Sequence, residues 1–241
     1  MIVQACLNGA RNSDFHPELP VSVQQLVESA VSAVRAGANE LHVHVRDFDG
    51  VESLHPLNVD ELIGELRNQL PGTLIGISTG GWIENDDERR FEYIASWRKI
   101  PDHASVNLEE SGAFDVGLAL HRRGVGIEAG LATRDDAIRL VESPLAPLIL
   151  RVLIEPDGQD LDESMHIASD IIGVLSRSTF RKPILLHGFD TTVWPFIQRA
   201  CRTGQSIRIG FEDTKYLPDG TEAQSNAQLV AAAIDLKRSM L

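Results

Sequence analysis

Short runs of apolar and β-branched residues alternate along the chain with longer amphipathic segments. Eight of these runs are expected to form strands, at residues 2–7, 40–45, 73–78, 104–108, 125–129, 148–154, 183–188 and 206–212. Each is followed by a segment with apolar residues at helical spacing, such as 21–37 after the first run and 223–240 after the last. This alternation predicts repeated βα units around a parallel sheet.

Eight such units in 241 residues favour a closed (β/α)8 barrel, the TIM-barrel fold, over an open doubly wound sheet. The sequence contains neither a dinucleotide-binding glycine pattern nor a phosphate-binding loop. No linker divides the chain, so we expect one catalytic domain over residues 1–241. Gly37 and Gly72 are expected to follow helix ends, and residues Asp60, Asp86 and Thr191 are expected to cap helix starts.

Composition narrows the kinds of partner. A net charge of −13 disfavours nucleic acids and anionic membrane surfaces as general partners, which leaves small molecules. No apolar run is long enough to span a membrane and no signal-peptide pattern opens the sequence, so a cytoplasmic enzyme with reduced Cys6 and Cys201 is expected. We also expect a homo-oligomer, although the apolar segment 227–236 could pack either on a partner or on its own barrel.

The predicted strand ends are unusually polar, and in such a barrel the carboxyl ends of the strands form the active site. His42 and His44 in "ELHVHVRD" are two residues apart on one strand, so they point to the same face. Imidazole is a common ligand of zinc, and two histidines with one carboxylate leave room for a substrate. Glu212 in "IRIGFED" is the best candidate for the third ligand, because the eighth strand closes the barrel near the first two.

Four segments together carry a family resemblance: "ELHVHVRDFDG", "ISTGGW", "ASVNLEESG" and "IRIGFED". In this order they resemble the signature segments of the β-keto acid cleavage enzymes, a family that includes 3-keto-5-aminohexanoate cleavage enzyme. The resemblance covers nearly the whole chain. It implies a zinc-dependent barrel that converts a β-keto acid and acetyl-CoA into acetoacetate and a new acyl-CoA. It also implies that His42, His44 and Glu212 bind Zn²⁺, with Asp213 as the general base and Arg208 as its charged partner.

This chemistry explains why such residues are needed. Cleavage of a carbon–carbon bond next to a ketone passes through an enolate, whose negative charge a zinc ion stabilises as a Lewis acid. A base must then remove the proton at C2. The hydroxyls and backbone amides of "STGG" could hold a carboxylate or enolate oxygen, and the resemblance favours substrate contacts by this turn. The candidate substrate-binding residues are Ser78, Thr79, Gly81, Asn107, Glu128 and Arg11.

The other polar residues receive weaker interpretations. Asn107 and Glu128 could equally satisfy polar groups of the barrel, and we expect Arg46 and Asp47 to be structural. His187 ends the seventh strand and could face the site, but the sequence offers no second partner for it. The remaining histidines are expected at the surface: His16, His55, His103, His121 and His166.

Two features depart from the family pattern. Arg11 lies near the place where members often carry an acidic residue that reaches an amino group of the substrate. An acidic or neutral β-keto acid is therefore expected, because an arginine pairs with a second carboxylate. The chain is also shorter than many relatives after its middle strands, which puts a docking surface for acetyl-CoA in question.

Three alternatives stay open at this stage. A metal-dependent aldolase or lyase could use the same zinc and base without CoA. An amidohydrolase-type hydrolase would place its HxH motif on the first strand and further histidines on the fifth and sixth, which this sequence does not. A noncatalytic barrel that binds a metabolite would need a closed shell of four zinc ligands, whereas the motif supplies three.

Overall fold

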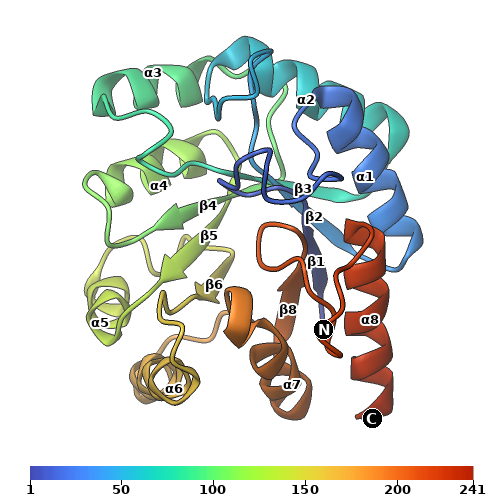
Figure 1. Ribbon diagram of the computed structural model, residues 1–241. Helices are drawn as coiled ribbons and strands as arrows, with labels where there is room; N and C mark the ends of the chain where they lie inside the picture. Colours follow the sequence, from blue (N-terminus) through green and yellow to red (C-terminus); the bar gives the residue numbers. More distant parts are fainter. Residues whose placement is uncertain (241) are drawn as a thin grey trace.

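Eight parallel strands close into a barrel in chain order, and β1 is hydrogen-bonded to both β2 and β8. This computed structural model describes residues 1–240. The strands are β1 (Val3–Cys6), β2 (Glu40–Val43), β3 (Leu74–Ser78), β4 (His103–Asn107), β5 (Gly126–Leu131), β6 (Arg151–Ile154), β7 (Ile184–Leu186) and β8 (Ser206–Ile209). The predicted (β/α)8 barrel is confirmed, and β8 lies beside β1 in Figure 1.

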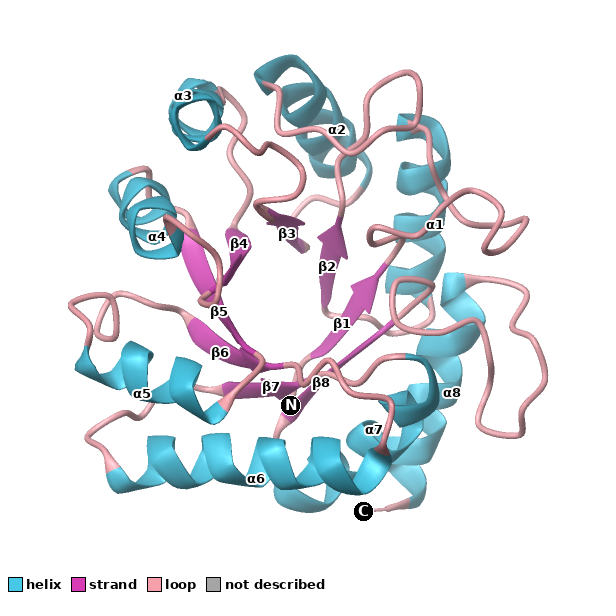
Figure 2. Ribbon diagram, turned by 60° about the vertical axis from the view of Figure 1, so that its left-hand side comes forward, coloured by secondary structure: helices cyan, strands magenta, loops and turns pink. Residues whose placement is uncertain are grey.

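A helix follows each strand, and the helices surround the ring of strands in Figure 2. They are α1 (Val23–Arg35), α2 (Pro56–Gln69), α3 (Asp87–Ser96), α4 (Ala113–Arg122), α5 (Arg134–Glu142), α6 (Leu161–Arg177), α7 (Val193–Thr203) and α8 (Asn226–Ser239), with a short 3₁₀ helix η1 (Asp190–Thr192) before α7. The apolar face of α8 packs on its own barrel, where Leu229, Val230 and Ala233 are buried. No helix within residues 1–240 has the length and apolar character needed to cross a membrane.

The helix ends follow local chemistry. Asp86 caps α3 as predicted, since its side chain accepts the Arg89 amide, and Gly37 has a positive φ just past α1. The prediction that Asp60 caps a helix was wrong, because this residue lies inside α2. Its carboxylate accepts hydrogen bonds from the backbone amides of Arg98 and Lys99 in the connection between α3 and β4. The prediction for Thr191 was wrong by one residue, because η1 displaces the cap of α7 to Thr192.

Several predicted strands are too long at their carboxyl ends. β8 stops at Ile209, because the Asp213 and Thr214 amides both donate to the Gly210 carbonyl and turn the chain away from the sheet. β2 stops at Val43, so His44 lies just past the strand. His44, Glu212 and Asp213 therefore lie in the first turns after their strands, at the open end of the barrel.

A layer of charged side chains fills the barrel beneath this end. Arg151 of β6 lies between Glu128 of β5 and Glu40 of β2, with Nε 2.5 Å from Glu128 Oε2 and Nη2 2.6 Å from Glu40 Oε2. His103 also belongs to this layer, because its Nε2 lies 3.2 Å from Arg151 Nη2 and 3.2 Å from Gln4 Nε2. The prediction of a surface position for His103 was therefore wrong. His16 is buried as well, stacked 4.3 Å from the Phe211 ring.

Candidate active site

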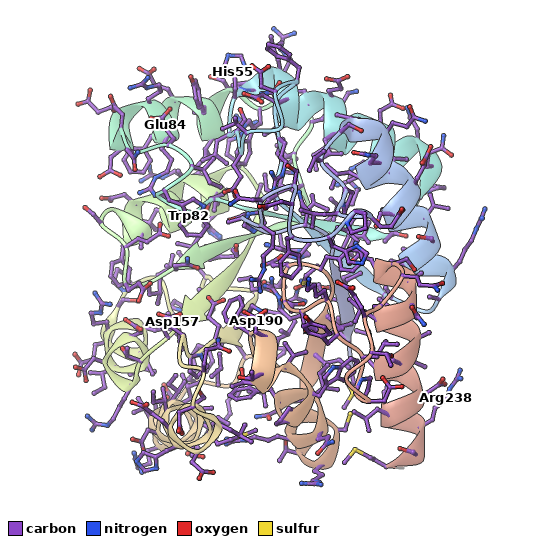
Figure 3. All side chains as sticks on the ribbon, in the orientation of Figure 1. His55, Trp82, Glu84, Asp157, Asp190 and Arg238 are labelled. Carbon is purple, nitrogen blue, oxygen red and sulfur yellow. The ribbon has the colours of Figure 1, made fainter. Side chains whose placement is uncertain are left out.

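The main cavity of the barrel opens at the carboxyl ends of the strands and has a volume of about 490 Å³. Residues from the carboxyl ends of the strands, and from the connections that follow them, line it in all eight βα units. Trp82, Asp157 and Asp190 come from three of these connections, and Figure 3 labels them. The cavity lies where the fold places an active site.

Three predicted metal ligands meet in the wall of this cavity. The candidate ligand atoms of His42, His44 and Glu212 all lie within 4.8 Å of one another. His42 Nε2 is 3.8 Å from Glu212 Oε2, and His44 Nε2 is 3.7 Å from Glu212 Oε1. Donor atoms on one tetrahedral zinc are roughly 3.4 Å apart, given bonds of about 2.0–2.1 Å. The three side chains are thus close to the spacing that a small divalent ion requires.

The protonation of these groups also suits a cation. Burial lowers the pKa of His42 well below its ordinary value, so its ring is neutral and can donate an electron pair. Burial alone would raise the pKa of Glu212, but Arg208 and the two histidines hold it well below its ordinary value. Burial would lower the pKa of His44, yet Glu212 and Glu52 raise it to about 9, so an arriving metal ion displaces a proton there. Glu212 Oε2 is buried without a hydrogen-bond partner among residues 1–240.

Two residues of the β1–α1 loop, Asn8 and Gly9, hold the candidate metal ligands in position. Asn8 accepts the His44 amide at 3.0 Å and donates to the His44 carbonyl at 2.9 Å, which extends the sheet pairing beyond the last residue of β2. Gly9 has φ +55° and packs against Glu212, so that a Cβ atom at this position would lie 2.5 Å from Glu212 Cγ. Only glycine combines this backbone conformation with so close an approach.

Arg208 connects the ligand Glu212 to its neighbour Asp213. Its guanidinium donates to Glu212 Oε1, and its Nε lies 3.6 Å from Asp213 Oδ1. His187 Nε2 lies 2.6 Å from the same Asp213 oxygen, and His187 Nδ1 lies 3.3 Å from Glu155 Oε2. His187 therefore has two partners, which the sequence did not reveal. Asp213 is fully buried beside the cavity, and its Oδ2 has no hydrogen-bond partner in the described chain.

The "STGG" turn contributes less to the cavity than predicted. Ser78 lines the cavity wall. Thr79, however, points away and donates its hydroxyl to the Ser105 carbonyl at 2.7 Å. The Gly81 amide is already used, because it donates to Glu110 Oε2 at 2.8 Å. The turn thus binds a carboxylate of the protein itself, and only Ser78 is placed to meet a substrate.

The remaining substrate-binding candidates divide between the wall and the interior. Asn107 lines the cavity and donates to Glu110 Oε1 at 3.1 Å. Glu128 lies in the charged layer beneath the cavity with no exposed surface, so the structure does not bring it to the substrate space. Its partner Arg151 explains this position, because a buried carboxylate needs a cation.

Arg11, a candidate substrate-binding residue from the sequence, lies in the β1–α1 loop and lines the cavity. Its Nη2 donates to Asp190 Oδ1 at 2.8 Å and its Nε donates to the Glu212 carbonyl at 3.0 Å. Three further carboxylates line the cavity, those of Glu109, Glu155 and Asp157. Burial raises the pKa of Glu109, and the charge of Asp157 raises it further. Arg11 is therefore one cation at a predominantly acidic cavity mouth.

The sequence analysis assigned no role to two residues of the site, although Trp82 ends the quoted segment "ISTGGW". Glu52, eight residues after His44, places Oε1 2.5 Å from His44 Nδ1. Trp82 donates its indole N–H to Glu52 Oε2 at 3.1 Å and lines the cavity. Arg46 and Asp47, in contrast, have the structural role that we expected: Arg46 donates to the Gly9 and Gly50 carbonyls, and Asp47 accepts amides of its own turn.

Comparison with known families tests the resemblance. The model of the beta-keto acid cleavage enzyme family matches residues 1–136 and 165–240. This chain belongs to that family. The stretch between the matched parts, residues 137–164, contains most of α5, all of β6 and the connection to α6. The family model leaves this stretch after the middle strands unmatched.

Relatives with assigned activities cover almost the whole barrel. The 3-keto-5-aminohexanoate cleavage enzyme of Acetoanaerobium sticklandii is 26% identical over 255 residues, which include 99% of this chain and 92% of the relative. The 3-oxoadipate:acetyl-CoA acetyltransferase of Cupriavidus necator is 34% identical over 252 residues, 95% of this chain and 86% of the relative. One of these relatives is named a cleavage enzyme and the other an acetyl-CoA acetyltransferase, and the chain is an enzyme of the same family.

A solved structure supports the fold. The complex of ObcA with oxaloacetate matches with a TM-score of 0.75 at 14% identity. The match covers 93% of this chain but only 65% of the ObcA chain. At this level of identity the similarity concerns the barrel architecture alone.

Proposed function

We propose that this family member is a zinc-dependent enzyme that converts a β-keto acid and acetyl-CoA into acetoacetate and the CoA ester of the remaining fragment. The observation that carries the proposal is the convergence of His42, His44 and Glu212 in the wall of the main cavity. Two neutral imidazoles and one carboxylate suit zinc and leave positions for a chelating substrate. A bound zinc ion would supply a Lewis acid that stabilises the developing enolate charge.

The protein residues have separate tasks in this proposal. Asp213 takes the proton from C2 of the β-keto acid through Oδ2, the oxygen without a partner. Arg208 and His187 hold its other oxygen in place. Ser78 and Asn107 offer polar groups to the substrate from the cavity wall. The cavity must open slightly for this step, because Asp213 lies just behind the wall.

The substrate tail is proposed to be acidic or neutral. Arg11 is the only cationic side chain lining the outer part of the cavity among the described residues, and a guanidinium pairs readily with a carboxylate. The 34% identical relative is named for 3-oxoadipate, a substrate with such a second carboxylate. Glu109 and Asp157 on the cavity wall could pair with a positively charged substrate tail. A cationic β-keto acid is therefore the substrate against which acidic and neutral ones should be compared.

The test combines metal analysis with an assay. Zinc is measured by elemental analysis in the purified wild-type enzyme and in Asp213→Asn. Acetoacetate is measured from acetyl-CoA and a panel of acidic, neutral and cationic β-keto acids. The proposal expects about one zinc per chain in both proteins, with CoA-dependent acetoacetate in the wild type that falls at least about 100-fold in the variant.

Other outcomes separate the alternatives. Cleavage of the β-keto acid without CoA would identify a metal-dependent lyase. Bound zinc without turnover of any panel member would favour a noncatalytic barrel. Wild-type protein that binds no divalent metal would refute the assignment of His42, His44 and Glu212. The amidohydrolase alternative has little structural support, since the HxH motif lies at the end of β2, not of β1, and neither β5 nor β6 contains a histidine.

A further inference from the structure

Glu52 belongs to a small hairpin in the connection between β2 and α2. The Asp47 amide donates to the Val51 carbonyl at 2.8 Å, and the Ser53 amide donates to the Val45 carbonyl at 2.9 Å. This hairpin turns the chain back on itself immediately after His44. The hairpin thereby brings Glu52 back beside His44, where the connection begins.

Both oxygens of Glu52 are used, and they have different partners. Oε1 lies 2.5 Å from His44 Nδ1, and Oε2 accepts the Trp82 indole N–H at 3.1 Å. A carboxylate only accepts hydrogen bonds, so Nδ1 of His44 carries a hydrogen, and Nε2 is the nitrogen that faces Glu212 and can bind a metal ion. The Glu52 side chain is only 15% exposed.

Trp82 forms part of the wall of the substrate cavity. Its ring lies 6.3 Å from the His44 ring, centroid to centroid, with an angle of 26° between the two planes. The residue, labelled in Figure 3, is 47% exposed, comes from the β3–α3 connection and lines the cavity. The Glu52 side chain therefore hydrogen-bonds both a candidate metal ligand and a residue of the cavity wall.

We propose that Glu52 is a positioning residue for the metal centre. It fixes the orientation and tautomer of His44. Through its second oxygen it also couples metal binding at His44 Nε2 to the position of the Trp82 ring. The inference rests on the proposed metal centre, which it deepens. Carboxylates that orient a ligating histidine in this way are typically worth 10- to 100-fold in metal affinity.

A purely structural role would have a different signature. If Glu52 only pinned the hairpin, its loss would lower the thermal stability of the metal-free protein and leave the zinc affinity of the folded protein unchanged. If it positions His44, zinc affinity falls even where the metal-free variant is fully folded. Metal affinity is thus the decisive measurement, and catalytic activity is not needed for it.

The experiment uses metal-free full-length protein and a competing chelator of known zinc affinity. Zinc dissociation constants are compared for wild type, Glu52→Ala, the isosteric Glu52→Gln and Glu65→Gln. The last variant removes one exposed carboxylate of α2, and it controls for the change in net charge. Circular dichroism checks that each metal-free protein is folded. Tryptophan fluorescence is recorded during the titration, and Trp82→Phe identifies the signal of this residue among the three tryptophans.

The expected results are specific. Glu52→Ala weakens zinc binding 10- to 100-fold and Glu52→Gln weakens it about 10-fold, whereas Glu65→Gln stays within about twofold of the wild type. Zinc changes the fluorescence of the wild type, and this change is lost in Trp82→Phe. Folded Glu52 variants with wild-type zinc affinity would overturn the inference while leaving the metal centre intact. Absence of zinc binding in the wild type would overturn the metal centre itself, and this inference with it.

Discussion

Replacement of Glu128 by glutamine should destabilise the barrel by an amount that depends on pH. Glu128 is fully buried in the charged layer beneath the cavity, and its Oε2 lies 2.5 Å from Arg151 Nε. Gln4 donates to the same oxygen at 3.4 Å. Glutamine has nearly the same shape but no charge, so the variant leaves Arg151 with Glu40 as its remaining close carboxylate.

The magnitude follows from the proton affinity of the carboxylate. Burial alone would raise the pKa of Glu128, but Arg151 lowers it from 4.5 to about 2. A tenfold change in proton affinity corresponds to about 1.4 kcal/mol, so the ionised form contributes roughly 3 kcal/mol to the free energy of unfolding at neutral pH. Loss of one member of a buried ion pair typically costs about 3–5 kcal/mol, which agrees with this value.

The sign of the pH dependence follows from the same change. Because the pKa of Glu128 is lower in the folded state than in the unfolded state, the stabilisation is complete above about pH 4.5 and is lost as the pH falls toward 2. The difference between wild type and Glu128→Gln should therefore be roughly 3 kcal/mol at pH 7 and shrink to about 2 kcal/mol at pH 3.5.

Urea unfolding followed by circular dichroism at pH 7, 5 and 3.5 measures this difference, at constant ionic strength. Glu65→Gln on the exposed side of α2 is the control and should change stability by less than about 0.5 kcal/mol. A loss below about 1 kcal/mol in Glu128→Gln at pH 7 would refute the reasoning, because the cost of burying the pair would then cancel its attraction. A difference that is the same at all three pH values would show that shape, not charge, is responsible.

Three further predictions concern the site. Gly9→Ala should weaken zinc binding at least about 10-fold in chelator competition, because the new methyl group meets Glu212; unchanged affinity would mean that the loop adapts freely. His187→Gln should lower kcat about 10-fold with little change in KM or zinc content, because it releases Asp213; a change in KM alone would contradict this role. Arg11→Gln should raise KM about 10-fold for an acidic β-keto acid and leave a neutral one unaffected, and equal effects on both would exclude a pairing with the substrate tail.

Much of the fold, and the convergence of the three candidate metal ligands, could be predicted because both depend on regular spacing. Apolar runs at strand length and helical segments between them determine the barrel. The two-residue spacing of His42 and His44 places them on one face, and closure of the barrel brings Glu212 to them. These are properties of repeated geometry that a single sequence displays.

The remaining contacts depend on turns and long side chains, which carry no periodic pattern. Glu52 reaches His44 only because a hairpin folds back, and nothing in the spacing of the two residues indicates this. The Gly81 amide was expected to bind substrate, but Glu110 from the next connection occupies it. His103 was expected at the surface because the predicted strand begins one residue after it, yet it belongs to β4, and neighbours from β1 and β6 enclose it inside the barrel.

The order of the strands has a consequence for how the enzyme is made. The two histidines lie at the end of β2, Glu212 follows β8, and β1 lies between these strands and is paired with both. During synthesis the histidines leave the ribosome long before the carboxylate, and the last strand must dock against the first before the third ligand is in place. A nascent chain that ends before β8 can offer a metal ion two imidazoles at most from this trio. The trio of candidate ligands is thus completed only after β8 has been synthesised and has paired with β1.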